Sequence, residues 1–394
     1  MQAVPTALSL VSNGWLPALP PFLLASIVTI AAVPLTMLMA RRFGAVAEPD
    51  ADRHLHPSPT PRLGGLALFI GFTVALMAFG GAVPNRWQVV AVTAAITAAM
   101  LVDDIFDLPW NAKLAIEVGA GVLAVLLGIT INYLTVPGSH GPSPFGLGLL
   151  IAPITVVFVL GMQVSINFLD GSDGVAAGVV GIVATVLLLA AVNRIQGPGD
   201  VQHGVIVMSG ALMGCCAGFL VFNLPPARVF MGDTGSHFLG VALAVISILG
   251  VAKIAVGLAL FIPLIALGLP IGDTAFAIVR RRRAGRSPTE PDAGHLHHRM
   301  LATGMSPLET ALTFYLMTAI LGCIALFIFG HRRILDVALG LLVVALVGLV
   351  WRSRRRSQRP DPQPDSAFDA DGSLLISGRR SVPARIHRRG GEAD

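Results

Sequence analysis

The sequence predicts an all-α, polytopic membrane protein, a bundle of about eleven transmembrane helices. Its 394 residues are 54% hydrophobic and only 12% charged, whereas a soluble domain carries roughly 25% charged residues. The mean hydropathy is +0.77, and the apolar residues form repeated runs of near-spanning length. The formal net charge of +5 comes largely from Arg clusters between these runs. We therefore interpret the charge as a topology signal and expect no nucleic-acid binding.

The expected spans follow from the criterion of roughly 20 apolar residues per transmembrane helix. We place them at 20–40, 64–83, 87–102, 113–131, 149–167, 174–192, 204–222, 236–253, 255–279, 308–330 and 333–351. Several runs are short or glycine-rich, so the sequence also permits ten or twelve spans. We expect residues 1–351 to form one membrane domain. The basic, polar segment 352–394 has too few apolar residues to fold alone and is expected to be a disordered cytoplasmic tail.

The basic residues predict the orientation. Arg41 and Arg42 directly follow the first apolar run, which places the N-terminus outside and, with eleven spans, the C-terminus in the cytoplasm. No basic residue precedes Arg41, so we expect no cleavable signal peptide. The same alternation puts most arginines and every segment with several Asp residues on the cytoplasmic side. Charge bias and acid placement are independent features, and they agree.

The first group of acids directly follows the expected span 87–102. Asp103, Asp104 and Asp107 place three carboxylates within five residues. If the stretch is helical, Asp103 and Asp107 share one face, where like charges repel, and near a membrane they are costlier still. One interpretation is that the acids are simply solvated at the membrane boundary. Because more Asp pairs follow later runs, we favour a shared cation such as Mg²⁺, which usually takes one or two carboxylates plus substrate phosphates.

Two later cytoplasmic loops combine acids with glycines. The stretch 167–174, NFLDGSDG, contains Asp170 and Asp173, and its glycines let the backbone approach an anion near a helix N-terminus. The alternative is a turn that caps the next helix. In the stretch 223–236, Asp233 stands between two glycines and beside two hydroxyl groups, where packing requires no acid. Asp233 is therefore our first choice for a metal ligand.

Other polar candidates have simpler alternatives. Asp273 is expected inside the ninth span, where an acid indicates function, but it could instead pair with Arg280 and fix the helix end. Lys113 either snorkels from the start of the fourth span or joins the site. The loop sequence HLHHR at 295–299 suits phosphate binding better than zinc, because no cysteines or helical i, i+4 histidine pair accompany it. A solvated loop is the alternative there.

The three cysteines, Cys215, Cys216 and Cys323, lie inside apolar runs. Their spacing matches neither a disulfide framework nor a zinc site. We expect them to be small core residues.

Taken together, the acids and loops predict phosphoryl transfer at the inner face of a helical bundle. One substrate would be a soluble, metal-bound phosphate ester such as a nucleotide sugar, and the other a lipid phosphate that reaches the same plane from the bilayer. Positioning and charge stabilisation supply most of the catalysis in such reactions.

The motifs resemble, in order, five signatures of the polyprenyl-phosphate N-acetylhexosamine-1-phosphate transferases, which are glycosyltransferase family 4. DDIFDL with Lys113 resembles the first, NFLDGSDG the second and VFMGDTGS the third. LPIGDT with its Arg run, and then HLHHRM, resemble the fourth and fifth. The resemblance implies a polytopic plasma-membrane enzyme with a cytoplasmic active site and Mg²⁺ or Mn²⁺. It also implies transfer of a sugar 1-phosphate from a UDP-sugar to undecaprenyl or decaprenyl phosphate, with release of UMP.

The resemblance assigns expected roles by position. It implies that Asp233 binds the metal and that Asp103 and Asp104 activate the lipid phosphate or assist metal binding. The full set of expected catalytic residues is Asp103, Asp104, Asp170, His297 and His298. The expected substrate-binding residues are Lys113, Asn167, Asp173, Asn223, Phe230, His295 and Arg299.

The chain is more similar to the family branch that uses UDP-GlcNAc, for the first membrane step of cell-envelope glycan synthesis, than to the phospho-MurNAc-pentapeptide translocases. The translocases usually have three consecutive histidines before Phe-Glu and lack a third acid in the first motif, whereas this chain has Asp107 and HLHHR. Ser172 and Glu117 depart from the family pattern and leave the hexosamine open. A translocase-like enzyme, a non-enzymatic transporter and an inactive scaffold are the alternatives.

Two mechanisms agree with these motifs. Either the lipid phosphate attacks the β-phosphorus directly, or an Asp first forms a covalent intermediate. We favour direct attack, because Mg²⁺ and hydrogen-bond donors can position two phosphates without a protein nucleophile. The expected partners are the two substrates and the bilayer, and the enzyme could form a homodimer.

Overall fold

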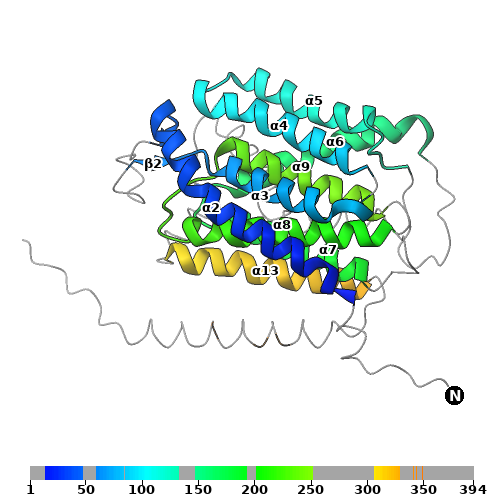
Figure 1. Cartoon of the computed structure of the whole chain (residues 1–394). Coiled ribbons are helices and arrows are strands. Elements are labelled where there is room, and N and C mark those ends of the chain that lie inside the picture. The colour runs from blue at the N-terminus through cyan, green and yellow to red at the C-terminus, as the bar shows by residue number, and fades with distance from the viewer. Residues whose placement is uncertain are drawn as a thin grey trace, which may run out of the picture. The chain divides into compact units, whose positions relative to one another are not determined.

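The computed structural model describes residues 14–47, 59–83, 85–132, 147–192, 201–251 and 306–328, with single positions at 340, 343 and 348. Within these ranges the chain is a bundle of helices with one small two-stranded sheet (Figure 1). The prediction of a helical membrane bundle is confirmed in this part. The expected span 255–279 with Asp273, the loop 295–299 and the tail 352–394 lie outside the described residues, so the boundary at 351 stays a prediction.

The helices coincide with the expected apolar runs. They are α2 (Leu19–Phe43), α3 (Gly64–Phe79), α4 (Arg86–Phe106), α5 (Trp110–Leu126), α6 (Ile151–Leu169), α7 (Val175–Val192), α8 (Val201–Asn223), α9 (Gly232–Val251) and α13 (Pro307–Ile328). Short 3₁₀ turns are η1 (Leu16–Ala18), η2 (Gly80–Ala82) and η3 (Gly148–Leu150). Strand β1 (Val46–Ala47) pairs antiparallel with β2 (Thr60–Pro61).

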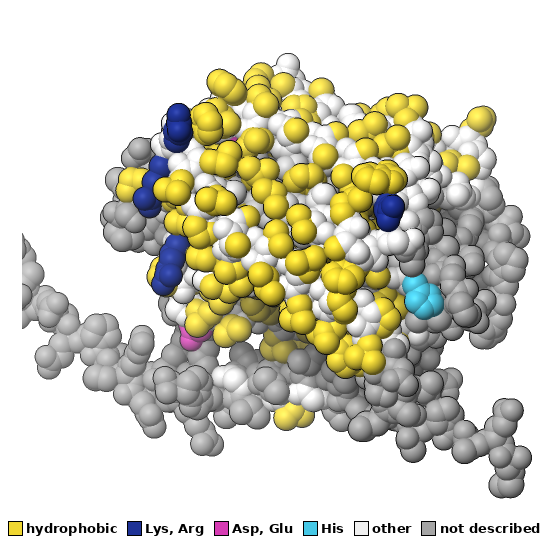
Figure 2. All heavy atoms as spheres, viewed as in Figure 1, with side chains coloured by type: hydrophobic (Ala, Val, Ile, Leu, Met, Phe, Trp, Pro, Cys, Tyr) yellow, Lys and Arg dark blue, Asp and Glu magenta, His cyan; other side chains and the backbone are white. Residues whose placement is uncertain are grey.

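Several of the described helices are long enough to span a membrane. In the described ranges, seven helices are long and apolar enough to cross a membrane, and Gly64–Phe79 is a shorter apolar helix. The chain is therefore a multi-pass membrane protein, while the count of eleven and the orientation stay predictions. Apolar side chains dominate the face drawn in Figure 2, and the Lys and Arg side chains visible there lie toward its two ends. Helix α2 exposes Ile27, Leu35 and Leu38, as expected for a helix that faces hydrocarbon.

Helix α4 ends later than predicted. Asp103 and Asp104 belong to its last turn, and Asp107 caps its C-terminus with a left-handed backbone of φ 52°. The prediction that Asp103 and Asp107 share one helix face required a helix through Asp107, and this condition is not met because α4 ends at Phe106. The Asp107 side chain is fully exposed, whereas Asp103 is buried.

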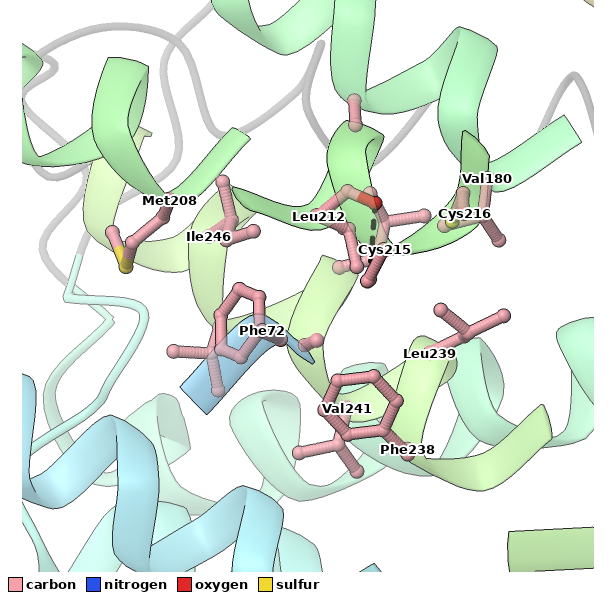
Figure 3. Close-up of a cluster of buried hydrophobic side chains, with 14 of the residues drawn as sticks. Phe72, Val180, Met208, Leu212, Cys215, Cys216, Phe238, Leu239, Val241 and Ile246 are labelled. Atoms are coloured by element: carbon pink, nitrogen blue, oxygen red, sulfur yellow. Dashed lines mark hydrogen bonds between the residues drawn. The ribbon is translucent and has the colours of Figure 1, made fainter. Parts of the chain in front are cut away.

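Helix α9 is the central element of the bundle. It packs against α3, α4, α5, α6, α7 and α8, and it is more completely buried than any other described helix of spanning length. Figure 3 shows Phe238 and its neighbours in α9 packed with Phe72 of α3, and with Met208 and Leu212 of α8. The rings of Phe72 and Phe238 meet edge to face, with centroids 5.7 Å apart. This packing fixes the first turns of α9 in place.

The three cysteines are buried. Cys215 and Cys216 are free and lie in α8 within this hydrophobic cluster (Figure 3). Cys323 is free and buried in α13. The prediction that they are core residues is confirmed.

The segment before α3 lies against the segment before α9. The backbone nitrogen of Phe230 donates to the carbonyl oxygen of Pro61 at 2.8 Å. In return, Gly64 and Gly65 donate to the carbonyl oxygens of Phe230 and Met231 at 3.0 and 2.9 Å. A Cβ atom on Gly65 would overlap the backbone nitrogen of Gly235 and lie 2.6 Å from the carbonyl oxygen of Met231. Glycine at position 65 is therefore a packing requirement.

We expect Gly65→Ala to lower the free energy of unfolding by about 3 kcal/mol, because the added methyl group would push α3 away from α9. Thermal unfolding in detergent measures the change. Gly119→Ala is the matched control, since Gly119 lies in α5 and nothing lies within 4 Å of its added Cβ. Alanine should be neutral or stabilising there. Equal falls in Tm for both variants would contradict the packing argument.

Candidate active site

A carboxylate from α4 holds the N-terminus of α9. Asp104 Oδ1 accepts a hydrogen bond from the backbone N–H of Asp233 at 2.9 Å. Its Oδ2 accepts from the backbone N–H and the hydroxyl of Thr234 at 2.9 and 2.6 Å. The first N–H groups of a helix have no partner inside the helix, and negative charge is stabilised at that end. Both oxygens of the buried Asp104 therefore serve to place α9.

Gly232 allows this close approach. Its φ is 66°, a left-handed conformation that favours glycine. A Cβ atom there would overlap the carbonyl oxygen of Arg62 and lie 2.5 Å from Asp104 Oδ2. The glycine before Asp233 is therefore required by the capping carboxylate.

Lys113 of α5 joins the acids of α4 and α9. Its ammonium nitrogen lies 2.8 Å from Asp103 Oδ2, 3.0 Å from Asp233 Oδ2 and 4.0 Å from Asp107 Oδ1. The other oxygen of Asp103 accepts from the backbone N–H of Leu108 at 2.9 Å. The side chains of Lys113 and Asp233 are 28% and 23% exposed, but that of Asp103 only 2%. The accessible side of the cluster is therefore at Lys113 and Asp233.

Helix α6 contributes Asn167 to the same point. Its side-chain nitrogen donates to Asp233 Oδ1 at 3.0 Å and to Ser236 Oγ at 3.1 Å. Asp233 thus has Lys113 at one carboxylate oxygen and Asn167 at the other. Side chains from α4, α5 and α6 meet at the first turn of α9.

Two loops beside this cluster are joined to each other. Asn223 Oδ1 accepts from the backbone N–H of Gly174 at 3.0 Å, and the Asn223 side-chain nitrogen donates to the carbonyl oxygen of Val229 at 2.8 Å. Asp173 Oδ2 accepts from the backbone N–H of Ala227 at 2.9 Å. Gly174 has φ 74°, as the glycine-rich motif predicts. Asp173 and Asn223 therefore hold the 170–174 loop against the 223–231 loop.

Helix α13 supports the first of these loops. The hydroxyl of Tyr315 donates to the carbonyl oxygen of Gly174 at 2.6 Å. The tyrosine ring occupies the place that a Cβ on Gly178 would need. A residue far along the chain thereby fixes the loop that carries Asp170 and Asp173.

Asp170 caps the C-terminus of α6 and is surrounded by other acids. Loss of hydration, followed by repulsion from the carboxylates of Asp233, Asp104 and Asp173, raises the pKa of Asp170 well above its usual value. Arg62 opposes this shift in part. A cation placed among these acids would remove the repulsion, so the cluster has the electrostatics of a cation site.

The structure brings most of the predicted site residues into one region. Asp103, Asp104, Lys113, Asn167 and Asp233 are joined by direct contacts, and Asp170 interacts electrostatically with Asp233 and Asp104. Asp173 and Asn223 join the adjacent loops, and Phe230 pairs through its backbone with Pro61 and Gly64. The remaining predicted residues are outside the described ranges: His295, His297, His298 and Arg299.

Sequence reasoning missed two polar neighbours of the cluster. The sequence motifs do not include His237, and they mark Glu117 only as a departure from a family pattern. His237 is buried, Glu117 is mostly buried, and the two contact each other. The signal that was available is their spacing, because each follows a site residue by four positions, one helical turn: Glu117 follows Lys113, and His237 follows Asp233.

The donor set suits a hard cation that substrate oxygens help to bind. In the part of the chain that the structure describes, no three His, Cys, Asp or Glu side chains form a group that could hold a metal ion unaided. Mg²⁺ is usually bound by one or two carboxylates together with substrate phosphates. Asp233 at the accessible side of the cluster, with Asp103 beside it, fits that smaller requirement.

Comparison with known proteins gives consistent matches. Residues 86–251, which include α4 to α9, match the family model described as glycosyl transferase family 4. The probable undecaprenyl-phosphate N-acetylglucosaminyl 1-phosphate transferase of Bacillus subtilis (strain 168) is 34% identical over 75% of this chain and 80% of its own length. The decaprenyl-phosphate N-acetylglucosaminephosphotransferase of Mycobacterium tuberculosis (strain ATCC 25618 / H37Rv) is 33% identical, over 87% and 91%. A phospho-N-acetylmuramoyl-pentapeptide-transferase of Moorella thermoacetica is 30% identical, over 79% and 98%.

Proposed function

Because the chain belongs to glycosyl transferase family 4, we propose that it transfers N-acetylglucosamine 1-phosphate from UDP-N-acetylglucosamine to polyprenyl phosphate. The products are polyprenyl-diphosphate-N-acetylglucosamine and UMP. An oxygen of the lipid phosphate forms a bond to the β-phosphorus of the donor. The bond between that phosphorus and the bridging oxygen breaks, and the bridging oxygen leaves on UMP. Undecaprenyl and decaprenyl phosphate are the acceptors named for the relatives.

The observation that carries this proposal is the convergence on Asp233. A reaction between two phosphate groups needs positive charge at their meeting point. Lys113 supplies one such charge at 3.0 Å from Asp233, and the carboxylate of Asp233 can hold another. The transporter alternative predicts charges near the middle of the membrane, whereas this cluster lies at the ends of α4 and α6 and the start of α9.

We propose Mg²⁺, with Mn²⁺ as a substitute, as the metal that the enzyme uses. Asp233 would hold the ion, and bound Mg²⁺ neutralises the charge that develops on a diphosphate. Lys113 lies where it can orient a phosphate oxygen, and Asn167 fixes the rotamer of Asp233. Asp104 holds α9 so that Asp233 faces the cluster.

Direct attack by the lipid phosphate is the mechanism that these contacts support. Each carboxylate oxygen of Asp103 and Asp104 already has a partner: Lys113 and Leu108 for Asp103, and the first turn of α9 for Asp104. A carboxylate whose oxygens already accept hydrogen bonds is a weaker nucleophile than a free one. Isotope exchange between UMP and UDP-N-acetylglucosamine in the complete absence of lipid acceptor would argue for a covalent intermediate instead.

The topology completes the proposal. Eleven spans with the N-terminus outside would place the cluster at the cytoplasmic face of the plasma membrane, where a nucleotide sugar is available. Arg41 and Arg42 in the last turn of α2 support this placement.

A donor panel tests the proposed function. Purified protein is incubated with Mg²⁺, polyprenyl phosphate and one of UDP-GlcNAc, UDP-GalNAc, UDP-QuiNAc or UDP-MurNAc-pentapeptide, and UMP release is measured. We expect UDP-GlcNAc to be the best donor, with no UMP when the lipid is omitted or when EDTA removes the metal. Turnover of UDP-MurNAc-pentapeptide alone would favour the translocase alternative. No UMP from any donor would favour a transporter or an inactive scaffold.

A further inference from the structure

A second polar contact lies one helical turn beyond the contact between Lys113 and Asp233. His237 Nε2 is 2.9 Å from Glu117 Oε1. Residues four apart on a helix lie on the same face, so the two contacts are successive links between α5 and α9. Helix α5 supplies the cation Lys113 to the first link and the acid Glu117 to the second.

The second link is enclosed by protein. The side chain of His237 is 2% exposed and that of Glu117 is 13% exposed. His237 Nδ1 lies 2.8 Å from the carbonyl oxygen of Asp233. A carbonyl oxygen can only accept, so Nδ1 is the donor in that contact. His237 is thereby bound at one nitrogen to the residue that we propose as metal ligand and at the other to α5.

Helix α6 contacts both α5 and α9 close to this link. The side-chain nitrogen of Gln163 donates to the backbone carbonyl oxygen of Glu117 at 3.1 Å. A Cβ on Gly240 would lie 2.7 Å from Gln163 Cα, so α6 and α9 are in close backbone contact there. Glu117 is therefore held by α6 through its backbone and by α9 through its side chain.

This link matters because α5 and α9 have few direct contacts. Helix α5 packs mainly on α6 and α4, which in turn pack on α9, so the two polar links are prominent among the direct contacts that set the register of α5 against α9. A buried polar pair is a well-attested way to fix the register between helices. A shift of about 1 Å is enough to reduce catalysis about 100-fold when it separates reacting groups.

We propose that Glu117 and His237 are positioning residues, whose contact holds α5 and α9 in the register at which Lys113 reaches Asp233. The inference rests on the proposed phosphotransferase function, and it adds two residues that act through Lys113 and Asp233. The hydrogen-bonded contact itself fixes the register. Replacements that keep a hydrogen bond across the link therefore preserve the site, and apolar replacements of similar size disturb it.

The test compares two kinds of substitution at each position. Glu117→Gln and His237→Gln keep a hydrogen-bonding group, whereas Glu117→Leu and His237→Leu remove it. We expect the Gln variants to keep kcat within about three-fold of wild type. We expect the Leu variants to lose about 100-fold in kcat, with KM for UDP-GlcNAc nearly unchanged. The double Leu variant should lose no more than either single one, because one contact is removed in all three.

Zero-length cross-linking measures the register of α5 against α9 independently of enzymatic activity. Carbodiimide coupling joins an amine to a carboxylate that it contacts, and mass spectrometry measures the Lys113–Asp233 product against the Lys113–Asp103 product. In the Leu variants we expect the ratio to fall at least five-fold, since only the first product depends on the register of α5 against α9. This ratio distinguishes the two proposals. If wild-type protein releases no UMP, the proposed function fails, and the cross-links still test the link.

Gln202→Ala is the matched control for stability. Gln202 donates to the carbonyl oxygen of Gly250 at 3.1 Å, at the opposite end of α9. We expect this variant to lower Tm while leaving kcat and the cross-link ratio at wild-type values. The inference is overturned if the Leu variants keep a wild-type cross-link ratio, or if Gln and Leu variants lose equal activity. If a Leu variant does not fold, the Gln variant at that position decides by its cross-link ratio, which must match wild type.

Discussion

Asp233→Asn is expected to reduce UMP release at least 1,000-fold while the protein still folds. Asp233 offers one carboxylate oxygen to Lys113 and the other to Asn167, and an amide can neither neutralise the ammonium nor bind Mg²⁺ as an anion. Removal of a group that stabilises charge in a transition state typically costs about 100-fold to 1,000-fold in turnover, and loss of the metal adds to this. The helix should survive, because Asp104 binds the backbone N–H of residue 233, whatever its side chain.

Asp107→Asn is the matched control for this experiment. Asp107 belongs to the same sequence motif as Asp103, yet its side chain is fully exposed and lies 4.0 Å from Lys113. Exposed ion pairs contribute little, so we expect less than about a five-fold change in turnover. A large loss in Asp107→Asn, or near-normal turnover in Asp233→Asn, would show that the contacts at Lys113 do not identify the chemical centre.

Asp104→Asn is expected to be the most destabilising substitution of an acid in the cluster. An amide would turn an NH₂ group toward at least one of the donors on Asp233 and Thr234 that now meet carboxylate oxygens. A buried donor left without an acceptor costs about 1–3 kcal/mol, and more when a charge is involved. We therefore expect a loss of about 3 kcal/mol in the free energy of unfolding, together with most of the activity.

Amide hydrogen exchange separates this effect from a purely chemical role. In Asp104→Asn the backbone amides of residues 233 and 234 should exchange faster than in wild type, because their acceptor has been replaced. In Asp233→Asn the same amides should exchange as in wild type. If Asp104→Asn loses activity with unchanged stability and exchange, then Asp104 acts on the substrates and its role as a cap is secondary.

Much of the fold and the family could be predicted from the sequence. Apolar runs of spanning length predicted the described helices, because a helix in lipid must be apolar over that length. The family resemblance drawn from five ordered motifs is confirmed by the matches to known proteins. The catalytic and binding roles assigned to single residues stay predictions, and for the histidine pair at 297 and 298 even the position lies outside the described residues.

The different contacts of the individual acids could not be predicted from the sequence. Asp103 and Asp104 are neighbours in one motif, but successive helical residues point about 100° apart. Asp103 therefore meets Lys113, whereas Asp104 meets the start of α9. A motif records that both residues are acids and carries no information about their different partners.

The link between Glu117 and His237 was missed for a related reason. The two residues are 120 positions apart in the chain. Glu117 is a single acid within an apolar run, and His237 directly follows the third motif without being part of it. Only the packing of α5 on α9 makes them a pair, so spacing could suggest each residue separately but not their contact.

The hydroxyl of Tyr315 on Gly174 limits how far the chain could be shortened. The matched family region, 86–251, contains every described acid of the cluster, and it would be a natural choice for a minimal fragment. Such a fragment would lack Tyr315, and it would also lack the backbone at 61–65 that forms hydrogen bonds with Phe230 and Met231. The fragment would contain the carboxylates but not these two contacts, which hold the loops at 170–174 and 230–231 in place. We therefore expect that the region 86–251 is not active as an isolated fragment. A chimaera that exchanges this region between two relatives should also take the flanking segments from the same relative.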